Sequence, residues 1–427
     1  MARNKIIDTI LLAACVFLSQ VLCDQEDNPI VSISNGKVKG VREKSYSARE
    51  YFGFHSVPYA KPPVGELRFN VSTNYCILKQ YFNIAHLILL KFPEPVENWD
   101  YIKDTTKDGP ACLQIKTSGD EVFGEEDCLW LSVFTPELPS VQRETRLKPV
   151  LVWIHGGRYA AGTARVSLYS PTYMMDYGDI VVVSIQYRMG ALGFLSTEDV
   201  IAPGNYGLHD QVLALKWIQE NIARFGGDPN QVTIDGHSAG AAAAHGHLVS
   251  KQNEGLFHKI IAMSGTSHMA WNSRYTIHKQ VAKQQADLVG CPSSSSEELI
   301  KCLRTVDAKT LTAAQSDLHS LFLRTNGKLP LTTYMPRTDL ESSNPFFHKV
   351  PREAMREGDF NKDIPLITGL TTQEGAWYVV SLLHEKGRED FHSLKYDIMH
   401  YMSGPDMLSL EVSLNCNIHC YNLGSLF

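Results

Sequence analysis

The chain has 427 residues, with 46 acidic against 40 basic side chains, so its formal net charge is −6 when histidine is neutral. This mild acidity argues against a nucleic-acid partner, which would require a basic surface. Apolar residues make up 44% of the chain and charged residues 20%, which excludes wholesale disorder and fibrous repeats and predicts a globular protein.

The first residues predict an export signal. Basic Arg3 and Lys5 precede an apolar run from Ile10 to Leu22, which is shorter than the roughly 20 residues of a membrane-spanning helix. We interpret residues 1–23 as a cleaved signal peptide and residues 24–427 as the mature chain. The alternative is a buried N-terminal helix. The first interpretation predicts a secreted, extracellular protein without a membrane span.

A secreted protein is expected to form disulfides, because disulfides persist in oxidising compartments. Two of the nine cysteines would leave with the signal, and the odd number that remains leaves one thiol to explain. The short-range candidate pairs are Cys112 with Cys128 and Cys291 with Cys302.

The pattern of apolar residues predicts the fold class. Asn35-Gly36, between two alternating segments, indicates a β-hairpin. Unbroken apolar runs further on are typical of strands in a parallel sheet covered on both faces, and the stretch 209–224 has helical spacing. We therefore predict one α/β domain with a mostly parallel central sheet, helices on both faces and an N-terminal antiparallel meander. The apolar runs are residues 150–154, 180–185, 232–234, 260–263 and 365–368.

Two glycine-rich segments follow predicted strands and carry chemistry. Gly236-His237-Ser238-Ala239-Gly240 leads into an alanine-rich, helix-prone stretch, a context that holds a serine strained and exposed as a nucleophile. The alternative is an ordinary serine at a helix start. His155-Gly156-Gly157-Arg158 follows the 150–154 run, and its backbone N–H groups could stabilise an oxyanion, although a plain turn is the other interpretation.

With these segments, the chain resembles the type-B carboxylesterases, the α/β-hydrolase family that includes cholinesterases and insect juvenile-hormone-type esterases. The resemblance covers roughly Ile30 to Tyr378, with one gap. It implies the α/β-hydrolase fold and hydrolysis of small-molecule carboxylic esters through an acyl-enzyme, with no cofactor and no metal. The other matching segments are residues 58–69, 126–133, 204–211 and 225–229.

The resemblance also implies the roles of individual residues. Ser238 would be the nucleophile, and Glu374 would be the acid that orients a catalytic histidine. The oxyanion donors would be the N–H groups of Gly157, Arg158 and Ala239. Arg158 departs from the family, which has glycine or alanine there, and its side chain could narrow the pocket.

The resemblance further implies which pairings hold the fold and which substrates are excluded. Disulfides Cys112–Cys128 and Cys291–Cys302 are implied. The Cys112–Cys128 loop contains no tryptophan that could stack on a quaternary ammonium, and Phe123 is its only aromatic residue, so choline esters are not expected substrates. Trp271 resembles an acyl-pocket residue but is equally a core tryptophan. The implied structural ion pairs are Arg68–Glu126 and Arg188–Asp210.

The sequence offers no evident catalytic histidine. The family has it in a His-Gly-Asp/Glu context, which no histidine after Glu374 shares, and the side chain of His237 should point away from Ser238. We therefore expect weak activity or none, and a sheet whose terminal strands are missing. The competing hypothesis is a non-catalytic binding or adhesion protein of the same fold. The histidines considered were His384, His392, His400 and His419.

Residues Val71–Lys91 separate two segments that relatives join almost directly. The segment contributes Cys76 and completes the glycosylation sequon that begins at Asn70. Its ends can be encoded as the consensus borders of an intron, so we interpret it as a retained intron or gene-model error, and the tail after about His384 in the same way. A genuine loop insertion is the alternative.

Overall fold

The computed structural model describes residues 28–69, 96–116, 121–140, 146–268, 277–326, 333–372 and 374. The predicted signal peptide, the segment Val71–Lys91 and the tail after His384 lie outside these described residues, as do Cys76 and Trp271. Those predictions therefore stay predictions.

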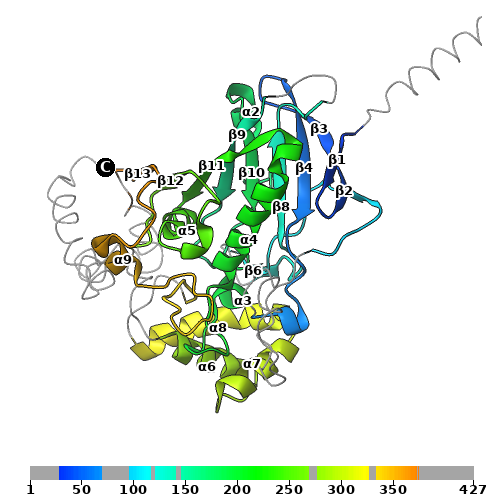
Figure 1. Ribbon diagram of the computed structural model, residues 1–427. Helices are drawn as coiled ribbons and strands as arrows, with labels where there is room; N and C mark the ends of the chain where they lie inside the picture. Colours follow the sequence, from blue (N-terminus) through cyan, green and yellow to red (C-terminus); the bar gives the residue numbers. More distant parts are fainter. Residues whose placement is uncertain are drawn as a thin grey trace, which may run out of the picture.

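A central eight-stranded sheet organises the described part of the chain (Figure 1). All pairs from β13 to β10 are parallel, whereas β10–β8, β8–β4 and β4–β3 are antiparallel. The five apolar runs all form strands of this sheet, so the predicted mostly parallel α/β sheet is confirmed. From one edge to the other, the strands are β13 (Leu366–Gly369), β12 (Lys259–Met263), β11 (Gly227–His237), β9 (Lys148–Ile154), β10 (Val181–Ile185), β8 (Trp130–Thr135), β4 (Glu50–Pro58) and β3 (Val41–Lys44).

The N-terminal meander is divided between two sheets. β1 (Ile30–Ile33) and β2 (Gly36–Lys39) form the predicted hairpin around Asn35-Gly36, but they join β5 (Ile102–Asp104) in a separate three-stranded sheet. The chain leaves this sheet at Gly40, where a side chain would lie 2.7 Å from the carbonyl oxygen of Gly53. A two-stranded ribbon of β6 (Gln114–Ile115) and β7 (Val122–Phe123) stands apart.

Helices cover the sheet and add a layer beside it. Figure 1 shows α4 and α5 over the middle strands, with α6, α7 and α8 grouped together at the lower end of the molecule. The predicted helix over 209–224 is observed as α4 followed by a short 3₁₀ turn, η3. The helices are α2 (Thr172–Tyr177), α3 (Gly190–Phe194), α4 (Tyr206–Asn221), α5 (Ala239–His247), α6 (His278–Leu288), α7 (Ser296–Thr305), α8 (Ala308–Asn326) and α9 (Pro351–Glu357), with 3₁₀ turns η1 (Gly65–Leu67), η3 (Ile222–Phe225) and η4 (Lys251–Asn253). Across the described ranges, none of the helices combines the length and apolar character needed to cross a membrane.

Burial of the sheet is uneven. Every residue of β8 and β10 is buried, as their unbroken apolar sequences predict. Strand β13, the last strand at its edge among the described residues, is mostly exposed, and Ile367 retains 69% of its accessible surface. Cover on both faces is therefore confirmed for the centre of the sheet but not for β13.

The implied covalent and ionic pairings are present. Cys112–Cys128 and Cys291–Cys302 are disulfide-bonded. Arg188 donates from Nε and Nη2 to Asp210 at 2.7 and 2.6 Å, and both side chains are buried. Removing one partner of such a pair would leave a buried charge without compensation, at a cost of about 3–5 kcal/mol. Arg68 likewise donates two hydrogen bonds to Glu126, at 2.5 and 2.8 Å.

Candidate active site

Ser238 lies in a strained turn between a strand and a helix. β11 ends at His237 and α5 begins at Ala239, and Ser238 between them has φ 57° and ψ −120°. A non-glycine residue in such a conformation costs on the order of 1–3 kcal/mol and must be held by its surroundings. The Ser238 N–H donates to the carbonyl oxygen of Met263 at 2.9 Å, which fixes the turn against β12. The predicted sharp turn from strand to helix is observed, and the role of Ser238 as a nucleophile stays a prediction.

The glycines on either side of the serine are required by close backbone contacts. A Cβ at Gly236 would lie 2.3 Å from the carbonyl oxygen of Gly240, and one at Gly240 would lie 2.1 Å from that of Ile154. These distances are far shorter than carbon–oxygen contacts allow. The Gly-X-Ser-X-Gly pattern therefore follows from how tightly α5 approaches β9 and β11.

The glycine loop after β9 lies directly against this elbow. A Cβ at Gly156 would meet the carbonyl oxygen of His237 at 2.4 Å and the Cβ of Ser238 at 3.2 Å. Gly157 has φ +116°, and Arg158 has φ 58°, in the left-handed region that favours glycine. The carbonyl of Gly157 accepts the N–H groups of residues 160 and 161, both at 3.0 Å, which fixes the loop.

The structure thus brings two of the predicted oxyanion donors to facing segments. Gly157 is in the loop, and Ala239 is in the first turn of α5, where N–H groups have no intrahelical acceptor. The positive end of the α5 dipole also favours negative charge there. Arg158 is half-buried beside them. The arrangement suits a developing oxyanion on a substrate bound at Ser238.

His155 has a structural role beneath the loop. Its ring is fully buried and stacks on Tyr187 with centroids 4.4 Å apart. Burial lowers the pKa of His155 to about 4, against the smaller opposing effect of its contact with the Gly156 carbonyl, so the imidazole is neutral near pH 7. Its own carbonyl accepts the Tyr187 hydroxyl at 2.7 Å. These contacts anchor the end of β9, from which the Gly156–Arg158 loop begins.

Glu374 is held at the end of the neighbouring strands. Its Oε1 accepts the Ser264 hydroxyl at 2.6 Å and the N–H and hydroxyl of Thr371 at 2.8 and 3.0 Å. The hydrogen bond from Ser264 is the largest cause that lowers the pKa of Glu374, followed by that from the Thr371 N–H, so the carboxylate is ionised at neutral pH. A weaker contribution comes from His237.

The position of Ser264 connects the predicted acid, Glu374, to the predicted nucleophile, Ser238. Ser264 follows Met263, which pairs with His237 across β12 and β11 and accepts the Ser238 N–H. Ser238 and Glu374 therefore follow the carboxyl ends of β11 and β13, the two strands that flank β12. Ser264 was not among the residues predicted for the site, because its only signal in the sequence is a Ser-Gly pair directly after a predicted strand.

The general base is not among the described contacts. Described histidines bond elsewhere: His245 to Ser267, His247 to Gln211, and His348 to Asp359. His237 is exposed. The four histidines considered from the sequence, His384, His392, His400 and His419, lie outside the described residues. Within the described ranges, no group of three or more His, Cys, Asp or Glu side chains could hold a metal ion.

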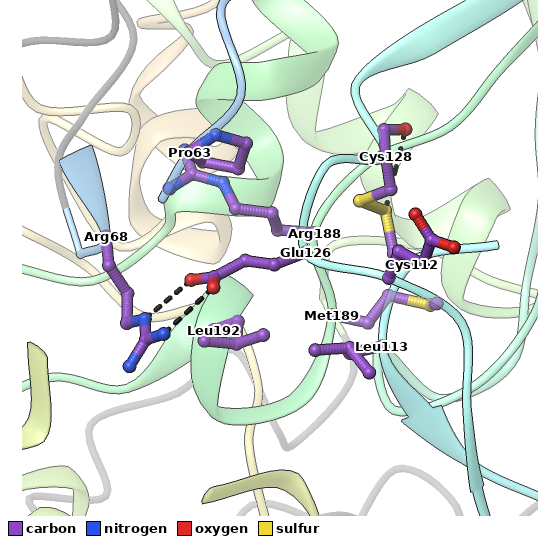
Figure 2. Close-up of a pocket in the computed structure, with 10 residues that line it drawn as sticks. Pro63, Arg68, Cys112, Leu113, Glu126, Cys128, Arg188, Met189 and Leu192 are labelled. Atoms are coloured by element: carbon purple, nitrogen blue, oxygen red, sulfur yellow. Dashed lines mark hydrogen bonds and ion pairs between the residues drawn. A yellow bond between two sulfur atoms is a disulfide. The ribbon is translucent and has the colours of Figure 1, made fainter. Parts of the chain in front are cut away.

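A small cavity lies near the structural ion pairs and not at Ser238. Figure 2 shows Arg68 bonded to Glu126 on one side and the Cys112–Cys128 disulfide on the other. The enclosed volume is about 10 Å³, which is the size of a single water site. We assign it to packing around the ion pairs.

Comparison with known proteins decides the family. A sequence model described as the carboxylesterase family matches residues 27–76 and 90–408. The chain belongs to the carboxylesterase family. The family predicted from the sequence is therefore confirmed, together with the α/β-hydrolase fold that it implies. The match skips residues 77–89, inside the segment interpreted as an insertion, and it extends 30 residues past Tyr378, into the tail that the sequence analysis treated as foreign.

Three esterases illustrate the relationship. Esterase FE4 of Myzus persicae is 38% identical over 386 residues, which are 90% of this chain and 62% of that protein. Juvenile hormone esterase of Tribolium castaneum is 36% identical over 387 residues, 88% of this chain and 60% of the relative. Pyrethroid hydrolase Ces2e of Rattus norvegicus is 34% identical over 399 residues, which cover 89% of this chain and 60% of that protein. The chain thus spans about three-fifths of the length of these relatives.

Proposed function

We propose that this chain hydrolyses small, uncharged carboxylic esters through an acyl-enzyme on Ser238. The observation that supports this most strongly is the strained backbone of Ser238, with the Gly156–Arg158 loop packed against it. Backbone strain of this size is found mostly at functional sites, where the surrounding structure holds it. Here the strain would expose a nucleophile beside oxyanion donors. Membership in a family of esterases agrees with it.

The chemistry proceeds in two steps. Ser238 Oγ attacks the ester carbonyl, a base accepts the serine proton, and the alcohol leaves with that proton as the acyl-serine forms. Water then attacks the acyl-serine and releases the acid. The N–H groups of Gly157, Arg158 and Ala239 stabilise the oxyanion in both steps. Glu374 contributes a negative charge that orients and stabilises a protonated histidine base.

Turnover should be slow. A serine without a base is a weak nucleophile near pH 7, and removing any triad member typically leaves about 10³–10⁴-fold acceleration over water. None of the candidate bases, His384, His392, His400 and His419, stands in the family context. We therefore expect a kcat below about 1 s⁻¹, the lower end for ordinary enzymes.

The cell compartment is also part of the proposal. Residues 1–23 would direct secretion, and two disulfides between described cysteines are consistent with an oxidising compartment. Asn70 would carry a glycan if its segment is retained. Extracellular esters, rather than cytosolic ones, are then the substrates.

Release of p-nitrophenol from p-nitrophenyl butyrate tests the function. The purified chain is compared with Ser238→Ala and with Ser294→Ala, an exposed serine that serves as the matched control. Slow release that depends on Ser238 but not on Ser294 supports the proposal. Fast Ser238-dependent turnover would show that one of the four histidines is a competent base. Release that is the same in all three chains would exclude an esterase and favour the binding-protein hypothesis.

A further inference from the structure

Helix α2 and the tip of the β3–β4 hairpin carry a group of exposed apolar side chains at the upper end of the molecule in Figure 1. Large exposed apolar patches mark surfaces that bind a partner or a membrane. The four side chains, which we call the tyrosine patch, are Tyr177 (89% exposed), Tyr46 (72%), Tyr173 (60%) and Met174 (42%).

The four side chains form one continuous surface. Tyr46 of the hairpin stacks on Tyr173 of α2 with ring centroids 4.8 Å apart. Residues three and four positions apart are neighbours on a helix, so Tyr173 and Met174 both lie beside Tyr177. The tyrosine patch therefore joins the hairpin tip to the outer side of α2.

The inner side of α2 is apolar as well. Met175 is only 1% exposed and belongs to a core cluster with Phe134 and Val182. A helix that is apolar on all sides is normally buried on all sides. The outer side of α2 is thus expected to be covered when the protein is in use.

The tyrosine patch is held in a fixed position. The Asp176 carboxylate accepts hydrogen bonds from the Ser47 N–H at 3.0 and 3.1 Å, from the Ser47 hydroxyl at 3.1 Å and from the Ser45 hydroxyl. Arg49 donates to the Asp176 carbonyl oxygen at 3.4 Å. These bonds fix the hairpin tip to α2, so binding through the patch would cost little ordering of the backbone.

The patch lies away from the candidate active site. Helix α2 leads into the start of β10, whereas Ser238 follows the end of β11. Both strands are parallel to β9, so the tyrosine patch and Ser238 are at opposite ends of the sheet. A partner on the patch would leave Ser238 uncovered.

The shape and chemistry of the patch favour a lipid surface as its partner. Tyr46 and Tyr177 are the most exposed of its rings, so the patch projects from the molecule. A rigid protein would need a matching pocket for such a projection, whereas a lipid interface deforms around it. Tyrosine is also enriched at membrane interfaces, where the ring is in apolar surroundings and the hydroxyl is among the headgroups.

The charges beside the patch agree with this partner. Lys44 and Arg49 are exposed on the same hairpin and outnumber the neighbouring carboxylate of Asp176. A small excess of positive charge is attracted to lipid phosphates and to anionic headgroups. The other charges of the hairpin are paired, Arg42 with Glu50 at 3.2 Å and Glu43 with His55 at 3.0 Å.

We propose that the tyrosine patch binds a lipid surface. The rings of Tyr46, Tyr173 and Tyr177 enter the interface with Met174, and Lys44 and Arg49 contact the phosphates. The protein then lies on the membrane through side chains of α2 and the hairpin. Ser238 faces the aqueous side, and ester hydrolysis is independent of this contact.

Co-sedimentation with sucrose-loaded vesicles tests the proposal. The vesicles contain four parts phosphatidylcholine and one part phosphatidylserine, and the full chain carries Ser238→Ala so that lipid esters are not hydrolysed. The bound fraction should rise with lipid concentration. Adding Met174→Ser and Tyr177→Ser should weaken partitioning by roughly tenfold or more, because two side chains no longer enter the interface.

Controls separate the patch from folding and from other surfaces. Met174 and Tyr177 are exposed, so the double variant should keep the thermal unfolding of the parent. Tyr101→Ser changes a tyrosine that is 57% exposed outside the patch, and it should bind as the parent does. High salt should leave binding in place, because apolar insertion is not screened.

Three results would overturn the proposal. The first is absence of vesicle binding at millimolar lipid, and the second is equal partitioning by the parent and the double variant. The third is a dimer of the parent in light scattering that the double variant lacks, without vesicle binding, which would assign the patch to a second copy of the chain.

Discussion

A cluster of three side chains, His55, Glu43 and Asp108, makes the folding stability depend on pH. His55 Nδ1 lies 3.2 Å from Asp108 Oδ1 and its Nε2 lies 3.0 Å from Glu43 Oε1, and we call this the His55 cluster. His55 is only 3% exposed, and burial by itself lowers its pKa. Hydrogen bonds and charge interactions with Asp108 and Glu43 outweigh burial and raise the pKa from 6.5 to about 9. A shift of this size corresponds to about 3 kcal/mol of differential stabilisation of the charged imidazole.

The sign follows from proton linkage. Because the folded pKa lies above the unfolded one, the folded state holds its proton more tightly. The contribution is fully present below about pH 6.5 and is lost as the pH rises to about 9. Tyr51 faces the same cluster, but burial and the Glu43 charge raise its pKa further above 10, so it does not titrate in this window. Arg165 Nε lies 3.9 Å from Asp108 Oδ2 in the same cluster.

Urea unfolding at pH 6 and pH 9.5 measures the effect. The parent chain should lose about 3 kcal/mol more stability across this interval than His55→Gln, which keeps a hydrogen-bonding side chain but cannot titrate. His258→Gln, at an imidazole that bonds only the Val232 N–H among its described contacts, is the matched control and should behave as the parent does. Identical pH dependence of the parent and His55→Gln would refute the reasoning.

Three further predictions concern the active-site edge and the disulfides. Ser264→Ala removes the largest cause of the lowered pKa of Glu374, so the acid limb of the pH–rate profile for p-nitrophenyl butyrate should move to higher pH. An acid limb that does not move would show that the ionisation of Glu374 does not affect the reaction. Arg158→Gly should stabilise the chain relative to Arg158→Ala by about 0.5–1 kcal/mol in urea unfolding, because only glycine adopts φ 58° without strain, whereas equal stabilities would contradict a strained loop. Replacing Cys291 and Cys302 by serine should cost on the order of 3 kcal/mol under non-reducing conditions, and peptide mapping that finds both as free thiols in the parent would contradict the bond.

Local patterns predicted those parts of the molecule whose geometry depends on neighbouring residues. The elbow at Ser238 could be read from the strand, the two glycines and the alanine-rich helix because each constraint acts within a few residues. The hairpin at Asn35-Gly36 was predicted for the same reason. Its separation from the main sheet was not, because that depends on pairing with β5, more than 60 residues later.

Contacts between distant segments left little trace in the sequence. Glu374 could be singled out only through family resemblance, because a loop carboxylate has no local signature, and its partner Ser264 is 110 residues away. The His55 cluster joins a strand, its neighbour and a loop more than 50 residues later. Exposure of β13 could not be read from Leu366–Gly369 either, because an apolar strand has the same sequence at an edge as in the centre of a sheet.

The most direct test of the central claim is to locate the nucleophile itself. The full chain is incubated with a fluorophosphonate probe, digested and mapped by mass spectrometry, with Ser238→Ala and Glu374→Gln treated in parallel. The account predicts one covalent adduct, on Ser238, that forms more slowly in Glu374→Gln and is absent from Ser238→Ala. An adduct on another serine, or labelling of the Ser238→Ala chain at the parent's rate, would contradict it.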